Sequence, residues 1–440
     1  MSTERDTASG SQAPDSSTRW AIARLALALA AIVAVFVATG LSNLLIFIVA
    51  LVVIVVVHEL GHYLTAKWSR MKVTEFFIGF GPRLWSVRRG ETEYGVKPIL
   101  AGAYVKIPGM TNLDVVDAGD EPRTYRRQPF RRRILVASAG SIMHFVMAFI
   151  LALVLVGVFG VPTTSGVQVM GFVHWAGHAQ TAAQAAGIRA GERIVSVDGH
   201  DVSTPAQLSK DIAARQGRAV RIVVTRGGRR SAYRVRPQAG HKTTHTRREV
   251  LGPSPTPGKT DWLIGIKTAP ARVFVSKNPL QAVAWAGSDV GNVTRLTVVG
   301  MGRVFSPGGL RSLYSQVTNP QAATQAAKRP AASNRIASVV EIGRLATQAE
   351  AAGVYYFLSI LVALNISLGL LNMLPMLPLD GGHVVIAVYE RIRTRRGRPY
   401  YQADVTKLMP VAYAFMAVLL VIVGSAVFLD IAHPLANPFG

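Results

Sequence analysis

The sequence predicts an α-helical polytopic membrane protein with a membrane-associated β-hairpin region and one inserted extracytoplasmic α+β domain. Three observations support this fold class. Half of the 440 residues are hydrophobic and only 16% are charged, which is apolar-rich and charge-poor for a soluble protein. Several apolar runs approach the length of about 20 residues that crosses a hydrocarbon core. A long stretch of mixed, globular composition separates two groups of these runs.

Five apolar runs are candidate membrane spans, at residues 21–39, 41–64, 134–160, 354–374 and 409–429. The first run contains Arg24 and follows a polar tail, residues 1–19, which we expect to be disordered and cytoplasmic. Because this tail is long and no clear small-residue cleavage site follows, we expect a retained helix at residues 20–40 rather than a signal sequence. The sequence therefore predicts four core spans and an extra N-terminal span.

The formal net charge of +24 reflects many Lys and Arg residues. They cluster between the second and third runs and between the fourth and fifth runs, as at residues 131–133 and 391–398. Loops rich in Lys and Arg stay cytoplasmic, and five spans place both loops on the side of the N-terminus. No zinc-finger, RRM-like or helix-turn-helix signature is present, so we attribute the charge to membrane orientation and lipid headgroups rather than to nucleic acid.

The loop between the second and third runs, residues 71–110, alternates short aromatic and β-branched segments with Gly and Pro. Such a pattern is typical of β-hairpins. Its apolar content fits a hairpin that enters the membrane under the cover of protein, and equally a small soluble sheet. This loop belongs to the first half of the membrane core, residues 41–160, and the second half is expected at residues 351–433.

Residues 166–275 form the predicted extracytoplasmic domain. The strand-like segments ERIVSVDG and AVRIVVTR flank the helix-like segment STPAQLSKDIAARQG, which indicates an α+β module. Residues 276–350 are expected to form an amphipathic helix and a linker. Apolar residues recur at helical spacing over residues 278–304, so we expect a helix there, on or near the membrane surface. Residues 307–337 are expected to be irregular.

The motif His58-Glu59-Leu60-Gly61-His62 ends the second apolar run. Histidines four residues apart lie on one face of a helix, close enough to bind one Zn²⁺. Glu59 lies at the edge of that face, where a carboxylate can take a proton from water at the metal. Polar residues inside an apolar run are functional candidates by default. The chain has no cysteine, so any metal must be held by His, Asp or Glu.

A catalytic zinc site typically has three protein ligands and one open position. The strongest third candidate is Asp380, in the segment NMLPMLPLDGGH at the end of the fourth run. Pro375, Pro378 and the two glycines after Asp380 would break the helix and expose its backbone to a cavity. The second and fourth runs share one direction through the membrane, so both motifs should lie at the same depth. The alternative is that Asp380 is a turn or capping residue before Gly-Gly.

The two motifs together resemble the paired signature of bacterial site-2 proteases, the intramembrane zinc metalloproteases of the regulator-of-sigma-E protease type in peptidase family M50. Their order and spacing fit this family over most of residues 43–433. The resemblance implies a Zn²⁺ cofactor with His58, His62 and Asp380 as ligands, and Glu59 as the general base.

The resemblance also implies residues that position the substrate. Asn372 would hydrogen-bond the extended substrate or polarise its carbonyl group, and Pro375 lies in the same element. Gly79, Gly81 and Gly102 belong to the hairpin region, which in this family is membrane-associated and contacts the substrate. Pairing with an edge strand holds a peptide extended, and proteolysis requires this because a helix hides its carbonyl groups.

The segment AAGIRAGERIVSVDGHDVST, residues 185–204, is similar to the heart of a PDZ domain, and we expect one copy within residues 166–275. Its groove would bind a newly cut C-terminus or act as a size filter. The third run reads AGSIMHF instead of the family's Gly-Pro…Asn pattern, which introduces His144. We expect an interhelical role for His144, with catalysis as the alternative. His383 either supports Asp380 or has a capping or surface role.

The resulting functional expectation is an intramembrane zinc metalloendopeptidase in the bacterial plasma membrane, with its active site near the cytoplasmic side. The family suggests regulated intramembrane proteolysis of single-span proteins, such as anti-sigma factors or signal-peptide remnants, after a first extracytoplasmic cut. An alternative is a catalytically inactive, PDZ-bearing membrane scaffold. A metal transporter would need a polar path through several spans, whereas the acids and histidines here concentrate at one depth.

Overall fold

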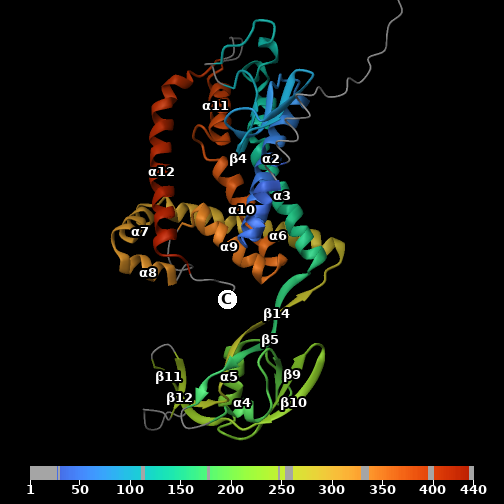
Figure 1. Cartoon of the computed structure of the whole chain (residues 1–440), viewed down its shortest axis with the longest axis vertical. Coiled ribbons are helices and arrows are strands. Elements are labelled where there is room, and N and C mark those ends of the chain that lie inside the picture. Colours follow the sequence, from blue (N-terminus) through green and yellow to red (C-terminus); the bar gives the residue numbers. More distant parts are fainter. Residues whose placement is uncertain are drawn as a thin grey trace, which may run out of the picture. The chain divides into compact units, whose positions relative to one another are not determined.

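The computed structural model describes residues 27, 30–110, 114–175, 179–245, 248–252, 261–328, 336–394 and 401–435. The chain divides into two compact units (Figure 1). Unit 1 comprises Met1–Leu155 and Gln281–Gly440, and unit 2 comprises Val156–Leu280. The predicted N-terminal tail and the start of the first apolar run, residues 21–26, 28 and 29, lie outside the described residues, and residues 30–38 of that run are helical.

Among the described residues, four helical segments are long and apolar enough to cross a membrane. They are α2 (Ser42–Trp68), α3 (Phe130–Val158), α10 (Val354–Asn372) and Val405–Ala432, which contains α12 (Met409–Ala432). Only 22–33% of each apolar window is buried inside the protein, so most of this surface needs lipid around it. The chain is therefore a multi-pass membrane protein, and the four predicted core spans are confirmed.

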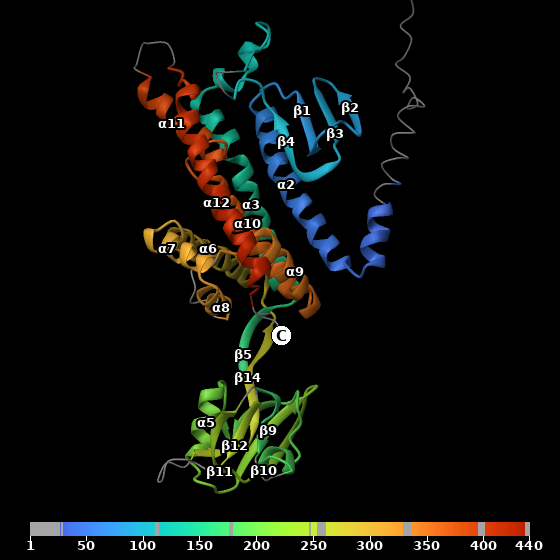
Figure 2. The same ribbon diagram turned by 60° about the vertical axis from the view of Figure 1, so that its left-hand side comes forward.

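The loop between α2 and α3 contains a four-stranded sheet that packs against α2 through its last strand (Figure 2). Its strands are β1 (Glu75–Phe80), β2 (Trp85–Arg89), β3 (Thr92–Val96) and β4 (Ile99–Lys106), in the order β2-β3-β1-β4. Strand β1 pairs in parallel with β3 and antiparallel with β4. The predicted strand-rich loop is therefore confirmed, and β4 is the strand that runs past the HELGH helix.

A helical region follows unit 2 in the chain. It consists of α6 (Pro279–Val304), α7 (Pro307–Thr318), α8 (Pro320–Lys328) and α9 (Val339–Ala352). The helix predicted over residues 278–304 is present as α6, but the expectation of irregular structure is wrong for residues 307–328. Ser306 caps α7 by accepting a hydrogen bond from the Gly309 N–H, and a proline occupies the first turn. Leu313 and Ala323 then pack against α12, which favours helices over a loose linker.

The described part of unit 2 contains two sheets and two short helices. The first sheet has the order β10-β9-β7-β5-β14, with β8 paired to β7; its strands are β5 (Val161–Phe172), β7 (Arg193–Val197), β8 (His200–Asp201), β9 (Val220–Arg226), β10 (Arg229–Val235) and β14 (Ile266–Val275). The second has the order β13-β11-β12-β6, with β6 (His174–Trp175), β11 (Gln238–His245), β12 (Arg248–Gly252) and β13 (Asp261–Leu263). The helices are α4 (Ala182–Ala185) and α5 (Pro205–Ala213). The two predicted strands and the predicted helix are thus present as β7, β9 and α5, around a core that includes Ile194, Leu208 and Ile222.

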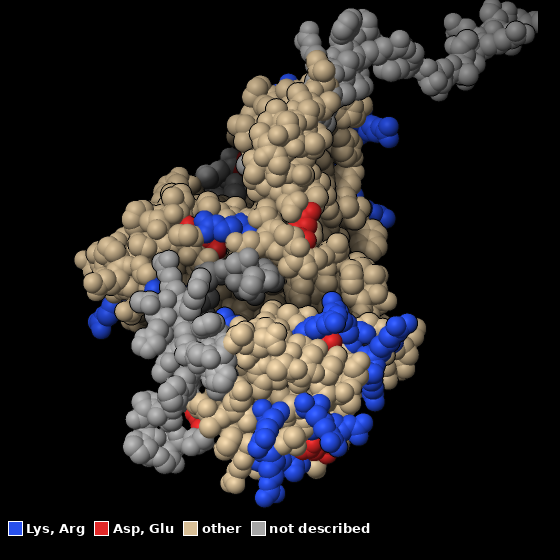
Figure 3. All heavy atoms as spheres, turned by 60° about the horizontal axis from the view of Figure 1, so that its bottom comes forward, with Lys and Arg blue, Asp and Glu red and all other residues tan. Residues whose placement is uncertain are grey.

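Unit 2 also carries a strongly basic face (Figure 3). Exposed arginines lie on β9, on β10 and next to these strands in the chain: Arg215, Arg218, Arg221, Arg226, Arg229, Arg230, Arg234 and Arg236. The rule that basic loops stay cytoplasmic accounts for the loops of unit 1. It does not account for these arginines, so the net charge has more than one origin.

Candidate metal centre

Helix α2 presents His58 and His62 on the same face, as their spacing predicts. Their Nε2 atoms lie 3.2 Å apart, and the two residues are only 7% and 8% exposed. The Nδ1–H of His62 donates a hydrogen bond of 2.8 Å to the carbonyl of Val136 in α3. This bond fixes the tautomer and leaves the Nε2 lone pair free for a metal ion.

Asp380 is the first residue of helix α11 (Asp380–Arg393). Its Oδ2 lies 3.5 Å from Nε2 of His58 and 3.4 Å from Nε2 of His62. The tight turn before α11 depends on Gly381 and Gly382, because a Cβ at Gly381 would lie 2.3 Å from backbone oxygens of the turn. The structure therefore brings Asp380 to the two histidines, from which the sequence separates it by more than three hundred positions.

The three ligand atoms fit a zinc ion. Zn–N and Zn–O bonds of about 2.0–2.1 Å in a tetrahedral site place neighbouring ligand atoms about 3.4 Å apart, and the observed separations are 3.2, 3.4 and 3.5 Å. The Oδ2 atom of Asp380 is buried and has no hydrogen-bond partner among the described residues. Such an orphaned carboxylate oxygen between two imidazoles is costly unless a cation satisfies it.

Glu59 follows the first histidine and lies beside β4. Its carboxylate is within reach of the backbone amide of Val105, and Val105 itself packs against the cluster that joins α2, α3 and β4.

His383 lies three residues after Asp380. Burial lowers the pKa of His383 below its ordinary value, while the Asp380 carboxylate acts in the opposite direction. The site thus combines three ligand atoms with one further carboxylate on the ligand helix.

Comparison with known proteins decides the family. The model of peptidase family M50 matches residues 46–419. The chain belongs to peptidase family M50. It is 31% identical to the zinc metalloprotease Rip1 of Mycolicibacterium smegmatis over 419 residues, which cover 90% of this chain and 98% of Rip1. It is also similar to Rip1 of Mycobacterium tuberculosis strain H37Rv, at 30% identity over 90% of this chain and 98% of that protein. A putative zinc metalloprotease of Clostridium acetobutylicum is 26% identical over 89% and 98% of the two chains. This M50 protein is therefore a zinc metalloprotease, and the His-His-Asp cluster is where its metal fits.

The M50 core contains one site residue that the sequence argument missed. Gly140 of α3 lies directly against the two imidazoles: a Cβ built there would be 2.3 Å from Cε1 of His58 and 2.4 Å from Nε2 of His62. Gly61, between the two histidines, has its own close approach to α3 at Ala139 and Met143. The signal was present in the glycine of AGSIMHF, but one glycine in a long apolar run does not reveal which neighbour it faces.

The predicted substrate-positioning residues occupy two places in the M50 core. Asn372 is the last residue of α10, and Pro375 lies in the turn that leads to α11. Gly79 and Gly81 have positive φ angles of 90° and 98°, and the β1–β4 register shifts around Gly79. A Cβ at Gly79 would lie 2.5 Å from the Lys97 carbonyl oxygen, and one at Gly102 would lie 2.8 Å from the Phe80 ring. The local sheet geometry thus disfavours a larger residue at Gly79 and at Gly102. Contact of the three glycines with a substrate stays a prediction.

Proposed function

We propose that this protein performs regulated intramembrane proteolysis: it hydrolyses a peptide bond in a single-span membrane protein that another protease has already cut on the extracytoplasmic side. The observation that carries the proposal is the His58, His62 and Asp380 cluster with Glu59 beside it. Two ligands lie in the second half of the candidate span α2, and the third begins α11, after the candidate span α10 has ended. We place the site near the cytoplasmic side of a bacterial plasma membrane, because the basic loops of unit 1 flank it.

Two imidazoles and one carboxylate would hold the zinc ion, through Nε2 of His58, Nε2 of His62 and Oδ2 of Asp380. The ion supplies Lewis acidity, which makes water a nucleophile at neutral pH and polarises a carbonyl group. Glu59 accepts the proton from the attacking water and delivers it to the nitrogen of the leaving amine. The Val136 carbonyl keeps the His62 imidazole in the tautomer that binds metal.

Strand β4 offers a way to hold the substrate extended. It ends the strand order β2-β3-β1-β4, so its second edge has no strand partner within the described part of unit 1. The amide of Val105 on this strand lies within reach of the Glu59 carboxylate. A peptide that pairs with β4 would therefore expose its carbonyl groups next to the general base. Asn372, at the end of α10, would orient the scissile carbonyl.

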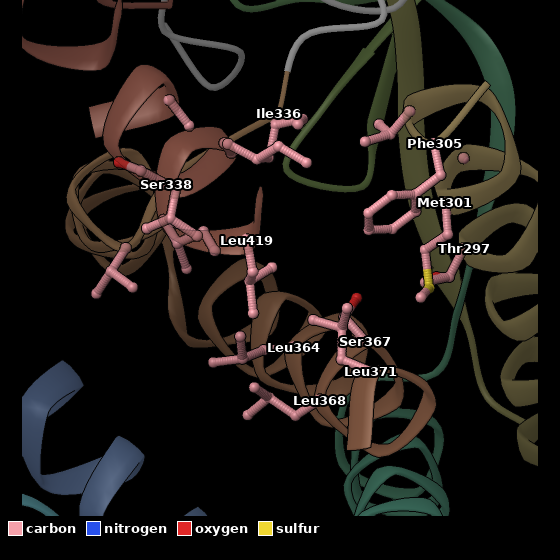
Figure 4. Close-up of a pocket in the computed structure, with 18 of the residues that line it drawn as sticks. Thr297, Met301, Phe305, Ile336, Ser338, Leu364, Ser367, Leu368, Leu371 and Leu419 are labelled. Atoms are coloured by element: carbon pink, nitrogen blue, oxygen red, sulfur yellow. The ribbon is translucent and has the colours of Figure 1, made fainter. Parts of the chain in front are cut away.

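An apolar cavity of about 600 Å³ lies in unit 1, and we propose that it receives a few apolar side chains of such a substrate (Figure 4). Helices α2, α6, α9, α10 and α12 all contribute to its lining. Phe47 and Leu51 line it from α2, and the helical spacing places His58, seven residues after Leu51, on the same face. Leu364, Leu368 and Leu371 line the cavity from α10. Leu371 directly precedes Asn372 in the chain. A substrate whose apolar side chains enter this cavity would lie beside α2 and α10, the helices that carry His58, His62 and Asn372.

We propose that unit 2 is an extracytoplasmic PDZ domain, on the strength of residues 185–204 and of the sheet and helix around them. It would admit substrates after the first cut, either by binding the new C-terminus or by excluding large ectodomains. Anti-sigma factors and signal-peptide remnants are the substrate classes we expect. The alternative function, an inactive scaffold, is disfavoured because Glu59 and all three ligand residues are present.

The test compares wild type with Glu59→Gln, both reconstituted in lipid with a single-span substrate. We expect both proteins to bind one zinc ion, and only wild type to cleave. His58→Ala is the control for the metal, and it should lose zinc. Cleavage by Glu59→Gln at the normal rate would refute the mechanism, and a wild-type protein without zinc would favour the scaffold.

A further inference from the structure

The proposed mechanism leaves a pair of buried polar side chains unused. His144 in α3 is 2% exposed and Asn365 in α10 is fully buried, both within membrane-spanning helices. Nδ1 of His144 lies 3.1 Å from Oδ1 of Asn365. Polar residues at membrane depth are costly, so they are kept where they have a partner and a function. This pair has the partner, and its surroundings indicate the function.

The hydrogen bonds of Asn365 define the orientation of His144. The Nδ2 group of Asn365 donates to the carbonyl of Leu361 at 2.8 Å, which assigns Oδ1 as the atom that faces His144. Nδ1–H of His144 therefore donates to Oδ1. Helix α10 also approaches α3 closely here, since a Cβ at Gly369 would lie 3.1 Å from Cβ of His144. The His144 ring is thus held by one hydrogen bond and by close backbone packing.

The fixed ring lies against a proposed zinc ligand. The ring centroids of His144 and His58 are 4.9 Å apart, with an interplanar angle of 43°. The His62 ring lies 4.9 Å from His58 in an edge-to-face arrangement, and Gly140 approaches from α3. Three neighbours therefore enclose the His58 imidazole.

The two histidine ligands differ in how their imidazoles are held. Nδ1 of His62 has the Val136 carbonyl at 2.8 Å. Nδ1 of His58 is buried and makes no hydrogen bond of ordinary geometry among the described residues, although the Gly140 carbonyl lies beside this imidazole. The orientation of His58 must therefore come mainly from packing, and His144 supplies one of the packing surfaces.

We propose that His144 and Asn365 form a positioning pair that fixes the His58 imidazole for zinc binding: Asn365 orients His144, and the His144 ring orients His58. This inference rests on the proposed ligand set. Neither residue needs to touch the substrate, so they are positioning residues. Ligand-orienting neighbours of this kind typically contribute 10–100-fold to metal affinity.

The experiment uses the full chain in detergent, stripped of metal and reloaded with Zn²⁺ or Co²⁺. Four variants are compared with wild type: His144→Ala, His144→Phe, Asn365→Leu and, as control on the same helix, Ser359→Ala, whose hydroxyl donates to Tyr355 within α10. The measurements are zinc affinity by chelator competition, the visible absorption of the Co²⁺ form, and thermal unfolding of the metal-free protein.

We expect His144→Ala to weaken zinc binding by about 10–100-fold and to change the Co²⁺ spectrum. His144→Phe keeps a ring against His58, so it should retain more affinity than His144→Ala. Asn365→Leu should weaken binding less than His144→Ala, because it loosens the ring without removing it. The Ser359→Ala control should match wild type in zinc affinity and spectrum.

If His144→Ala and Asn365→Leu keep wild-type affinity and spectrum, and lower only the unfolding temperature, the pair is an interhelical contact and the proposal is overturned. Should His144→Ala not fold, the same comparison between His144→Phe, Asn365→Leu and wild type decides. The outcome is separate from that of the proposed function: proteolysis by Glu59→Gln would refute the latter and would leave these metal-binding results standing.

Discussion

The contact between Gly140 and the two histidines leads to a sharp prediction for Gly140→Ala. The new Cβ would lie 2.3 Å from Cε1 of His58 and 2.4 Å from Nε2 of His62, whereas ordinary contact begins at 3.4 Å. At least about 1 Å of overlap must therefore be removed at both rings. Helix α3 is continuous here, so the imidazoles are the part that moves.

The expected effects of Gly140→Ala on stability and on zinc affinity depend on how far the two imidazoles must move. Replacing a helical Gly by Ala gains about 0.5–1 kcal/mol in helix propensity, and overpacking costs about 1–3 kcal/mol. The difference is a net cost of about 0–2.5 kcal/mol, so we expect at most a moderate loss of stability in the metal-free protein. Metal ligands, however, must stay within about 0.5 Å of productive geometry. We therefore expect zinc affinity to fall by at least about 10–100-fold and proteolysis by about 100-fold or more.

The assay is zinc titration of the metal-free variant, followed by cleavage of a reconstituted substrate at saturating zinc. Gly157→Ala is the matched control, because Gly157 lies on the same helix and a Cβ there would have no heavy atom within 4 Å. That variant should bind zinc and cleave like wild type. If Gly140→Ala behaved like Gly157→Ala in both measurements, the packing of α3 against the ligand rings would be wrong.

Two further predictions concern the elements around the site. Arg133 and Glu390 form an ion pair of 2.6 Å with side chains 4% and 6% exposed. Glu390→Leu alone should therefore lower the unfolding free energy by about 3–5 kcal/mol, and adding Arg133→Met should recover much of this loss. Equal stability of the single and double variants in denaturant would contradict this prediction. The Tyr104 hydroxyl donates to Glu75 at 2.6 Å and holds the pKa of Glu75 below its ordinary value of 4.5. The contribution of this hydrogen bond to stability is present above pH 4.5 and is lost as the pH falls through the lower pKa of Glu75 in the folded protein. Tyr104→Phe should therefore destabilise the protein at pH 7 and much less in acid. A pH series of thermal unfolding measures this difference.

The metal ligands could be predicted from the sequence because their spacing is a local property. The four-residue spacing of His58 and His62 defines one helix face, and the prolines before Asp380 and the glycines after it mark a turn that presents a carboxylate. The contributions of α3 could not be predicted in the same way. Gly140 and His144 act through helices that are distant in sequence, and a periodic apolar pattern does not state which face of α3 meets α2 and which meets α10.

The error at residues 307–328 has a related cause. The Ala, Gln, Ser and Pro residues of this segment predict irregular structure, because few large apolar residues recur there. Two helices form because proline is tolerated in the first turn and because small apolar side chains such as Ala323 fit closely against α12. Composition underestimates helices of this type, since their stability comes from tertiary contact with a neighbour that the sequence does not identify.

The depth of the site explains how a hydrolytic centre works within a membrane helix. Helix α2 has 27 residues and is therefore about 40 Å long, which exceeds a hydrocarbon core of about 30 Å. His62 lies six residues before the helix end at Trp68, or about 9 Å along the axis. If α2 is centred in the hydrocarbon core, we expect His62 close to the boundary of the core and His58, four residues earlier, about 6 Å deeper. Asp380, the most exposed of the three side chains at 18%, enters from a turn rather than from the middle of a span. Water has a short path to the ligands on that side, while the remainder of α2 can stay in lipid.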